Sequence, residues 1–146
     1  MSRDEKFKPY VAVWLIAEKN EQILLLRRYN TGYMDGHYTL VSGHLEENEG
    51  VTAAMIREAK EEAGLSLSRE QISIGHVTHR KCPDREYIDF FFVVKDLSDN
   101  PENMEPDKCD DMQWFTMSEL PDNILPNVKF ALDAISKKSH FDEYGW

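Results

Sequence analysis

The sequence is poor in cysteine and in positive charge. Only two cysteines, Cys82 and Cys109, stand among 146 residues. That number excludes a disulfide framework and favours a reducing compartment in which both thiols are structural. The 17 basic residues are outnumbered by 27 acidic ones, so the formal net charge is -10. A chain of this sign is not expected to bind long nucleic acids through their phosphate backbones.

Long apolar runs are missing as well. No run approaches the roughly 20 residues that cross a bilayer. The charged N-terminal segment MSRDEKFKPY (1–10) also lacks the apolar core of a signal peptide. We therefore expect a cytoplasmic protein without a membrane partner. Repeats and low-complexity segments are absent, and the length corresponds most simply to one domain, residues 1–146.

The chain does contain a mixture of strand and helix patterns. Apolar, β-branched runs predict strands at residues 10–18, 22–29, 38–43, 72–80, 87–97 and 112–117. Residues 29–38 and the acidic stretch 98–111 are typical of loops. One helix is predicted from Glu49 or Gly50 to Gly64, and another from Pro126 onward. Because strands and helices do not alternate regularly, we expect an α/β sandwich around a mixed sheet.

The first predicted helix has an unusual polar face. Glu58, Glu61 and Glu62 lie three and four residues apart, so they share one face near the helix C-terminus. The helix dipole disfavours negative charge there. A solvated charged face is one interpretation, because like charges at this spacing cost only a few tenths of a kcal/mol. The other is an all-oxygen site for Mg²⁺ or Mn²⁺, completed by carbonyls of the preceding glycine-containing loop.

The segment GHLEENEGVTAAMIREAKEEAGL (43–65) resembles the Nudix box, the signature of hydrolases acting on nucleoside diphosphates linked to another moiety. It has Ala59 where a bulkier aliphatic residue is usual, and VSGH (41–44) in place of the frequent PGGH. The resemblance implies a Nudix-type α/β/α sandwich around a mixed β-sheet. The charged and glycine positions of the box are all matched, by Gly43, Glu49, Arg57, Glu58, Glu61, Glu62 and Gly64.

The resemblance also implies roles for the acidic residues of the box. Glu58 and Glu62 become metal ligands, and Glu61 becomes either a ligand or the base that activates water. The carbonyl near Ser42–Gly43 completes the coordination of Mg²⁺, with Mn²⁺ as the alternative ion. A bound cation would offset the repulsion between an acidic protein and a phosphorylated substrate.

Other roles depend on pairing within the box or on residues outside it. Arg57 is expected to pair with Glu49 and to hold the loop against the helix. Arg28 resembles the arginine that approaches the substrate phosphates in MutT-type members, with a surface arginine as the alternative. Asn127 resembles a residue that hydrogen-bonds the base, with a helix N-cap as the alternative. An extra metal ligand from Glu105 or Asp107 is weighed against a solvated acidic loop.

The histidines and aromatic residues carry less information. His76 and His79 lie on a predicted strand beside Arg80, where they either face the substrate or have no role in the site. His44 lies inside the box loop, and no chemical role is assigned to it. Tyr33, Tyr38 and Phe91 are either stacking partners for a base or core residues.

Together these features predict a Mg²⁺-dependent Nudix hydrolase of the MutT-like branch. It would cleave a pyrophosphate linkage in a nucleoside di- or triphosphate, or in a related derivative, by attack of activated water on phosphorus. The ADP-ribose branch carries a proline fifteen residues beyond the box, where this chain has Arg80 with Pro83 three residues later. Dinucleoside polyphosphates, sugar nucleotides and capped RNA stay open as substrates.

Two other functions are weighed against hydrolysis. The main alternative is a nucleotide-sensing Nudix-fold module without turnover. Such modules typically lose box carboxylates, whereas this chain keeps all of them. An isopentenyl-diphosphate-isomerase-like activity would need a catalytic cysteine that we cannot place. The family resemblance also allows a homodimer.

Overall fold

The computed structural model describes residues 2–146. Met1, the first residue of the charged N-terminal segment, lies outside the described residues. The two α-helices are α1 (Val51–Ala63) and α2 (Pro126–Ser136). Short 3-10 turns are η1 (Arg3–Glu5), η2 (Arg69–Gln71) and η3 (Met117–Glu119). The strands are β1 (Tyr10–Lys19), β2 (Gln22–Arg28), β3 (Tyr38–Thr39), β4 (Val41–His44), β5 (Ser73–Lys81), β6 (Glu86–Val94), β7 (Cys109–Thr116) and β8 (Phe141–Tyr144).

The strands form one mixed sheet in the order β3-β2-β1-β6-β5-β8, with β4 paired to β1 and β7 paired to β2. Pairs β1–β6 and β5–β8 are parallel, and the others are antiparallel. Strands β1 and β2 pair only beside their turn, at Glu18–Ile23 and Lys19–Gln22. Beyond it, β1 continues along β4 and β6, whereas β2 continues along β3 and β7.

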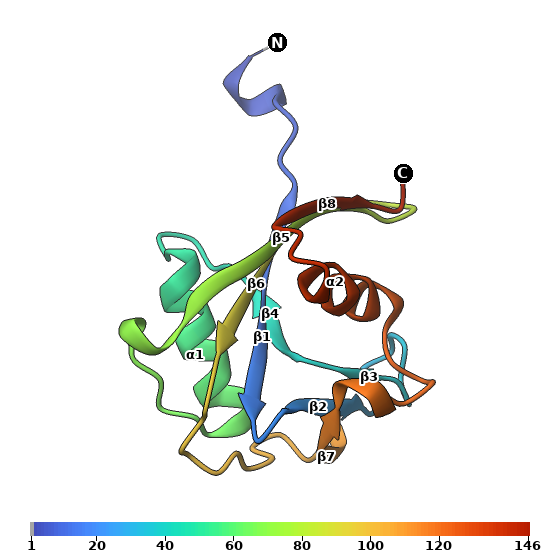
Figure 1. The fold of residues 1–146 in the computed structure, drawn as a ribbon. Helices are drawn as coiled ribbons and strands as arrows, with labels where there is room; N and C mark the ends of the chain where they lie inside the picture. Colours follow the sequence, from blue (N-terminus) through green and yellow to red (C-terminus); the bar gives the residue numbers. More distant parts are fainter. Residues whose placement is uncertain (1) are drawn as a thin grey trace.

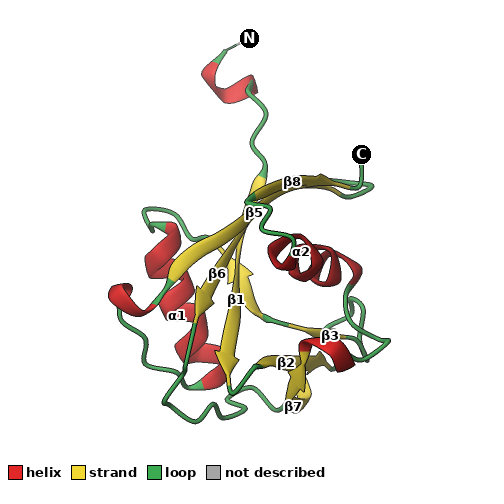
Figure 2. Ribbon diagram, viewed as in Figure 1, coloured by secondary structure: helices red, strands yellow, loops and turns green. Residues whose placement is uncertain are grey.

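One helix covers each side of the sheet, as Figures 1 and 2 show. Helix α1 packs through Ala54, Met55, Ala59 and Ala63 on one buried cluster. Helix α2 packs on a second cluster across the sheet, which contains Trp14 and Phe91 stacked with centroids 5.6 Å apart, besides other residues. The expected α/β/α sandwich around a mixed sheet is therefore confirmed.

The predicted limits of α1 are also close to those observed. Gly50 is the N-cap, and Gly64 ends the helix with φ 65°, a left-handed conformation that glycine adopts without a side-chain penalty. The narrow side chains of the buried alanines allow the helix to lie close to the sheet. Met55 lies on this buried face, whereas Ala53 is exposed.

Three other features differ from the sequence-based expectations. The strand predicted at 38–43 is interrupted at Leu40, where the chain leaves β2 and joins β1. Strand β7 begins at Cys109, three residues before the predicted start. Strand β8 was not predicted, because FDEY has no apolar run. Neither α-helix of the described residues is long and apolar enough to span a membrane.

Candidate active site

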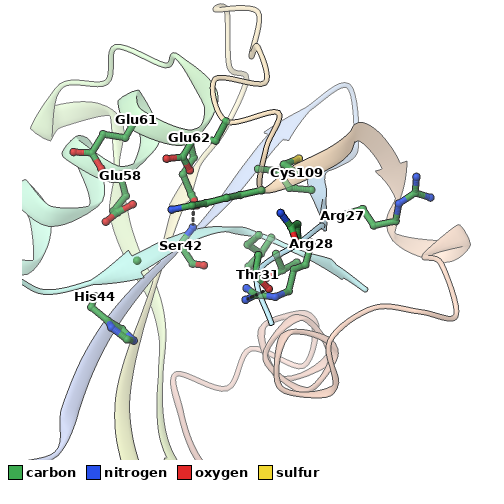
Figure 3. A pocket seen from close by; sticks show the side chains of 16 residues that line it. Arg27, Arg28, Thr31, Ser42, His44, Glu58, Glu61, Glu62 and Cys109 are labelled. Atoms are coloured by element: carbon green, nitrogen blue, oxygen red, sulfur yellow. Dashed lines mark hydrogen bonds between the residues drawn. The ribbon is translucent and has the colours of Figure 1, made fainter. Parts of the chain in front are cut away.

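A cavity of about 590 Å³ lies beside the C-terminal half of α1 (Figure 3). Its floor comes from β2, β3 and β4, and the loop before β7 contributes another wall. Charged residues dominate the lining and fall into two groups. The acidic group is Glu58, Glu61, Glu62 and Glu105, and the basic group is Arg27, Arg28 and Lys108. The cavity therefore has both a cation-attracting part and an anion-attracting part.

Two glutamates of α1 reach the backbone of β4. The Ser42 N–H donates to Glu62 Oε1 at 2.7 Å, the contact drawn as a dashed line in Figure 3. A Cβ atom at Gly43 would stand 2.1 Å from Cδ of Glu58, so only glycine leaves room for that carboxylate. Glycine is thus required at the first position of the box, because the Glu58 carboxylate occupies the space that a side chain at Gly43 would need. Both glutamates line the cavity.

Arg57 organises the other acidic groups. It binds Glu49 through two hydrogen bonds, Nε–Oε2 at 2.7 Å and Nη2–Oε1 at 3.0 Å. Its Nη1 also donates to Glu58 Oε1 at 2.8 Å and to Glu61 Oε2 at 3.4 Å. Nη2 further donates to the His44 carbonyl at 3.2 Å. The Arg57–Glu49 pair expected from the resemblance is therefore present, and it ties the loop to the helix.

The carboxylate of Glu62 is poorly solvated. Burial raises the pKa of Glu62 to about 8, and repulsion by Glu58 and Glu105 adds to this effect, while the Ser42 N–H opposes it. Burial likewise raises the pKa of Glu58, against the nearby Arg57. In contrast, hydrogen bonds from Arg57 lower the pKa of Glu49. A neighbouring cation would offset the free energy that it costs to ionise the buried carboxyl of Glu62.

The loop before β7 covers the end of α1. The N–H groups of Glu102 and Met104 donate to the carbonyls of Ala63 and Glu62, at 2.9 and 3.2 Å. Helix-terminal carbonyls that would otherwise lack partners are thus satisfied. Asn103 fixes the following turn by donating to the Cys109 carbonyl at 2.7 Å. These contacts hold Glu105 at the cavity beside the helix glutamates.

The basic residues come from the end of β2 and from this loop. The pairing of β2 with β7 is irregular between Arg27 and Arg28, where Asp110 is an extra residue. Such a bulge changes the direction of nearby side chains. Arg27 donates to Asp110 at 2.7 Å and points away from the glutamates in Figure 3. Arg28 instead donates to Tyr33 O at 2.6 Å and to Thr31 Oγ1 at 3.0 Å.

The residues at the helix end fit a hard divalent cation by chemistry, since their donors are carboxylate oxygens. Within residues 2–146, no three His, Cys, Asp or Glu side chains are already gathered in a ligating arrangement. The hydrogen bonds explain this, because Arg57 holds Glu58 and Glu61 while the Ser42 N–H holds one oxygen of Glu62. The close approach at Gly43 and the poorly solvated Glu62 both agree with a cation-binding role.

Several candidate residues lie outside this cavity. Asn127 does not line it, and the N-cap of α2 is Leu125, so the N-cap alternative was wrong. The Nδ2 atom of Asn127 is buried and has no hydrogen-bond partner among the described residues. Asp107 is exposed and does not line the cavity, whereas Glu105 does. His44 also lines it, and burial lowers its pKa, as do Arg80 and Arg85.

The strand residues beyond the box serve the core and the sheet edge. His76 is fully buried, and Arg80 forms a buried ion pair with Asp89 at 2.6 Å. His79 pairs with Glu86 at 2.9 Å. None of these residues lines the cavity. Of the aromatic candidates, Phe91 and Tyr38 are buried and Tyr33 is exposed.

Sequence reasoning gave no site role to eight of the residues that line the cavity, and Thr39, Lys108 and Cys109 are among them. Thr39 and Lys108 carry no pattern of their own and are brought to the cavity by the pairing of β2 with β3 and β7. Cys109 was assigned a structural role, and it is buried, with Sγ donating to the Asp111 carbonyl at 3.2 Å. A second cavity of about 590 Å³ lies near α2 and is lined largely by apolar residues such as Ile16, Val93 and Leu132. It contains none of the predicted site residues.

The fold and the site together define a Nudix-type hydrolase. The NUDIX domain model matches residues 6–136, so the chain belongs to the Nudix family. The match includes every box residue and leaves β8 outside it. Nudix hydrolases use a divalent metal, in agreement with the donor chemistry of the site.

Similar proteins come from several branches of the family. The chain is 28% identical over 131 residues to an ADP-ribose pyrophosphatase of Methanocaldococcus jannaschii, covering 90% of this chain and 76% of that protein. It is 29% identical over 90 residues to an 8-oxo-dGTP diphosphatase of Proteus vulgaris, covering 62% and 79%. A MutT NUDIX hydrolase from Burkholderia pseudomallei superposes with a TM-score of 0.79 at 23% identity, covering 87% of this chain and 98% of that one. The last similarity supports the fold.

Proposed function

We propose that this chain is a Mg²⁺-dependent pyrophosphohydrolase of nucleoside di- or triphosphates, or of a related nucleoside-diphosphate derivative. The observation that carries the proposal is the cavity in which glutamates of α1 face the basic residues of β2 and the loop before β7. A pyrophosphate group with its cation needs both kinds of charge within a few ångströms. An ordinary solvated helix face would not explain why Glu58 and Glu62 reach the backbone of β4.

Glu58 and Glu62 would hold the cation, with the Gly43 carbonyl and Glu61 as further oxygen donors. Mn²⁺ is the alternative to Mg²⁺ because the donor set is the same. When bound, the ion neutralises phosphate charge and lowers the pKa of an attacking water. The burial of Glu62 favours cation binding, since a bound cation would relieve the repulsion among the glutamates.

The other site residues position the reacting groups. Glu61 is the most exposed of the three helix glutamates, and its Oε1 makes no hydrogen bond within residues 2–146, so this oxygen would accept the proton of the attacking water. Arg57 holds Glu58, Glu61 and the Glu49 loop in one arrangement. Arg28 binds a substrate phosphate from the opposite side of the cavity. Asn127 is kept as a candidate contact for a more distant part of the substrate, because its amide is buried without a partner among the described residues.

The substrate class follows from the relatives and from the charge of the chain. The similar proteins include a pyrophosphatase of ADP-ribose and a diphosphatase of a modified deoxynucleoside triphosphate. A small nucleotide is therefore proposed as the partner, acted on by one cytoplasmic domain over residues 1–146. The net charge of -10 makes long nucleic acids unfavourable. A homodimer is an additional proposal taken from the family resemblance.

The first test is a Mg²⁺-dependent phosphate-release assay over a panel of nucleotides. Wild type should turn over at least one of them, and Glu61→Gln and Glu62→Gln should each lower the rate by about 100-fold or more. Glu47→Gln, an exposed change of the same kind, is the control. Mg²⁺ should also raise the Tm of wild type more than that of Glu62→Gln. Near-normal turnover in both variants would refute the roles, and tight nucleotide binding without turnover would favour the sensing module.

A further inference from the structure

The N-terminal arm, residues 2–9, projects from the folded body. In Figure 1 it extends beyond the sheet at the same end of the molecule as β8. Every residue from 2 to 8 is exposed, and Phe7 is 65% exposed. Among the described residues, the hydrogen bonds of the arm join only Ser2 and Glu5, at 2.7 and 3.2 Å. An exposed phenylalanine on a segment without hydrogen bonds to the body is thus left uncovered by its own chain.

Strand β8 is an edge of the sheet. It pairs with β5 on one side, and no strand of residues 2–146 pairs with its other side. The free edge of such a strand is a template for pairing with another segment. The Tyr144 ring lies 4.8 Å from the Phe130 ring of α2. Because successive side chains of a strand point to opposite faces, Tyr144 and Asp142 face this helix, while Phe141 and Glu143 face away from it.

The face of the sheet opposite α2 is apolar and open at this end. Phe141 is 57% exposed there and stands opposite Val77 of β5. Two residues further along β5, the His79 ring packs against Trp146, with centroids 4.8 Å apart, and Trp146 is 62% exposed. Helix α1 covers the same face over β4 and β1. The part over β5 and β8 thus exposes two large aromatic side chains.

The arm of the same chain is too short to cover the β8 edge. Four residues lie opposite one another across β1, β6, β5 and β8, namely Tyr10, Tyr87, Arg80 and Tyr144. Tyr10 is therefore three strand spacings, about 14 Å, from Tyr144, and a strand added outside β8 would lie about 19 Å away. Phe7 precedes Tyr10 by three residues, which span at most about 11 Å. Phe7 can therefore reach the outer edge of β8 only in another copy of the chain.

The arm and the β8 edge match in polarity. The backbone is extended at Lys6, with φ -70° and ψ 140°. An extended arm places Lys6 and Lys8 on one side and Phe7 on the other. Opposite residues of paired strands share a face, so with Phe7 beside Phe141 on the open face, a lysine lies beside Asp142 on the other face. The apolar residue then meets an apolar residue, and the cation meets an anion.

We propose that two copies of this chain form a two-fold dimer by exchanging arms, each of which adds to the β8 edge of the other copy. Phe7, Phe141 and Trp146 are each more than half exposed, which leaves on the order of 400 Å² of aromatic surface per chain. A stable interface buries about 800 Å² from each partner, of which roughly 60% is apolar. The exposed area is thus close to what such a dimer needs, and the reciprocal exchange closes with two copies.

This interface is separate from the cavity beside α1 and does not rest on the proposed hydrolysis. Among the described residues, no member of the arm or of β8 lines that cavity. Strand β8 also lies outside the NUDIX domain match. The contact surface is therefore a property of this chain that the family resemblance does not supply.

Sedimentation equilibrium of the full chain without nucleotide measures the association. At about 50 µM, wild type should have twice the chain mass of 17.0 kDa, and Phe7→Ser should raise the dimer Kd by about 30-fold or more. Tyr29→Ser is the control, because Tyr29 is an exposed aromatic residue outside the arm and β8. It should leave the Kd unchanged. A monomeric wild type at this concentration would overturn the proposal, whatever its activity on nucleotides.

Two complementary variants separate arm exchange from other modes of contact. Phe7→Asp removes the arm contact and keeps the β8 edge, whereas Phe141→Asp keeps the arm and places a charge on the edge. Each should be monomeric alone, since every contact in its homodimer has one defective member. An equimolar mixture should associate, because the heterodimer keeps one intact contact between arm and edge. Dimers of Phe7→Asp alone would show direct pairing of two β8 edges and would overturn the exchange, as would a mixture that stays monomeric.

Charge reversal tests the lysine contact without altering the apolar residues of the interface. Lys6→Glu together with Lys8→Glu should raise the dimer Kd about tenfold, because acidic residues would then face Asp142. Adding Asp142→Lys should restore most of the affinity, and this rescue does not depend on the folding of Phe141→Asp. An equal or larger loss of affinity in the triple variant would overturn the proposed register of arm and edge.

Discussion

At the scale of single residues, Glu62 shows how the site uses burial. Its pKa of about 8, compared with an ordinary 4.5, means that the folded chain keeps a proton that the unfolded chain has released. Between these two pH values the folded state binds more protons, so its stability falls as the pH rises. This loss of stability with rising pH applies to the protein without a bound metal ion. Ionised Glu62, at the position proposed to bind the cation, therefore lowers the stability of the folded protein.

Glu62→Gln should remove this pH dependence. In EDTA, wild type should lose on the order of 3 kcal/mol more stability than the variant between pH 5 and pH 8.5. Urea unfolding at several pH values measures this difference, with Glu47→Gln as an exposed control. Parallel stability curves for wild type and Glu62→Gln would show that Glu62 titrates normally. The same variant should also be inactive, so stability and turnover would change in opposite directions at high pH.

Gly43 gives a second prediction at this scale. In Gly43→Ala the new Cβ would overlap the carboxylate of Glu58, so this side chain must move. Because a displacement of about 1 Å at a reacting centre costs roughly 100-fold in rate, we expect a loss of that size in kcat/KM. Gly50→Ala is the matched control, since a Cβ added at Gly50 would meet no atom within 4 Å. Equal activity in the two variants would contradict a role for the Glu58 position.

At the scale of elements, a buried ion pair lies in the interior of the sheet. Arg80 on β5 donates to Asp89 on β6 at 2.6 and 3.1 Å, and Trp14 on β1 donates to the same carboxylate at 3.0 Å. The Asp89 residue is 0% exposed. The guanidinium also stands 4.1 Å from the centre of the Tyr87 ring. The network therefore ties three neighbouring strands together on the side of the sheet covered by α2.

Asp89→Asn should be strongly destabilising. It leaves the Arg80 charge buried without its counter-ion, which typically costs about 3–5 kcal/mol. Asp133→Asn is a matched control, because Asp133 pairs with Lys129 at an exposed position of α2. That exposed pair is expected to contribute no more than about 0.5 kcal/mol. Unfolding followed by tryptophan fluorescence measures both, and comparable losses would mean that the buried pair is solvated in solution.

The same scale shows what the sequence could and could not predict. Helix α1 was predicted almost to the residue, because Gly64 and the acidic positions carry strong local signals. The long apolar strands were predicted for the same reason. The interruption at Leu40, the bulge at Asp110 and strand β8 depend on pairing between distant segments, which no local pattern records. The places of Thr39 and Cys109 at the cavity follow from that pairing, so the sequence did not mark either as a site residue.

At the scale of the whole molecule, the charge of -10 contrasts with the composition of the cavity. Three basic residues line the cavity beside four glutamates, and the other acidic residues are spread over the chain. An approaching polyanion is thus repelled by most of the surface and is attracted only by these basic residues and by a cation held at the glutamates. The protein would therefore select ligands by size, since a small nucleotide contacts only the cavity and avoids the acidic surface.

The charge distribution predicts that long nucleic acids do not bind. A protein without an extended basic footprint cannot release many phosphate counterions, so its affinity for a 30-nucleotide single strand should be weaker than about 100 µM at physiological salt. Fluorescence anisotropy with labelled RNA and DNA in EDTA measures this affinity without hydrolysis. Binding in the low micromolar range that weakens steeply with added salt would contradict the prediction. It would then favour a capped or single-stranded RNA over a free nucleotide as the partner of the cavity.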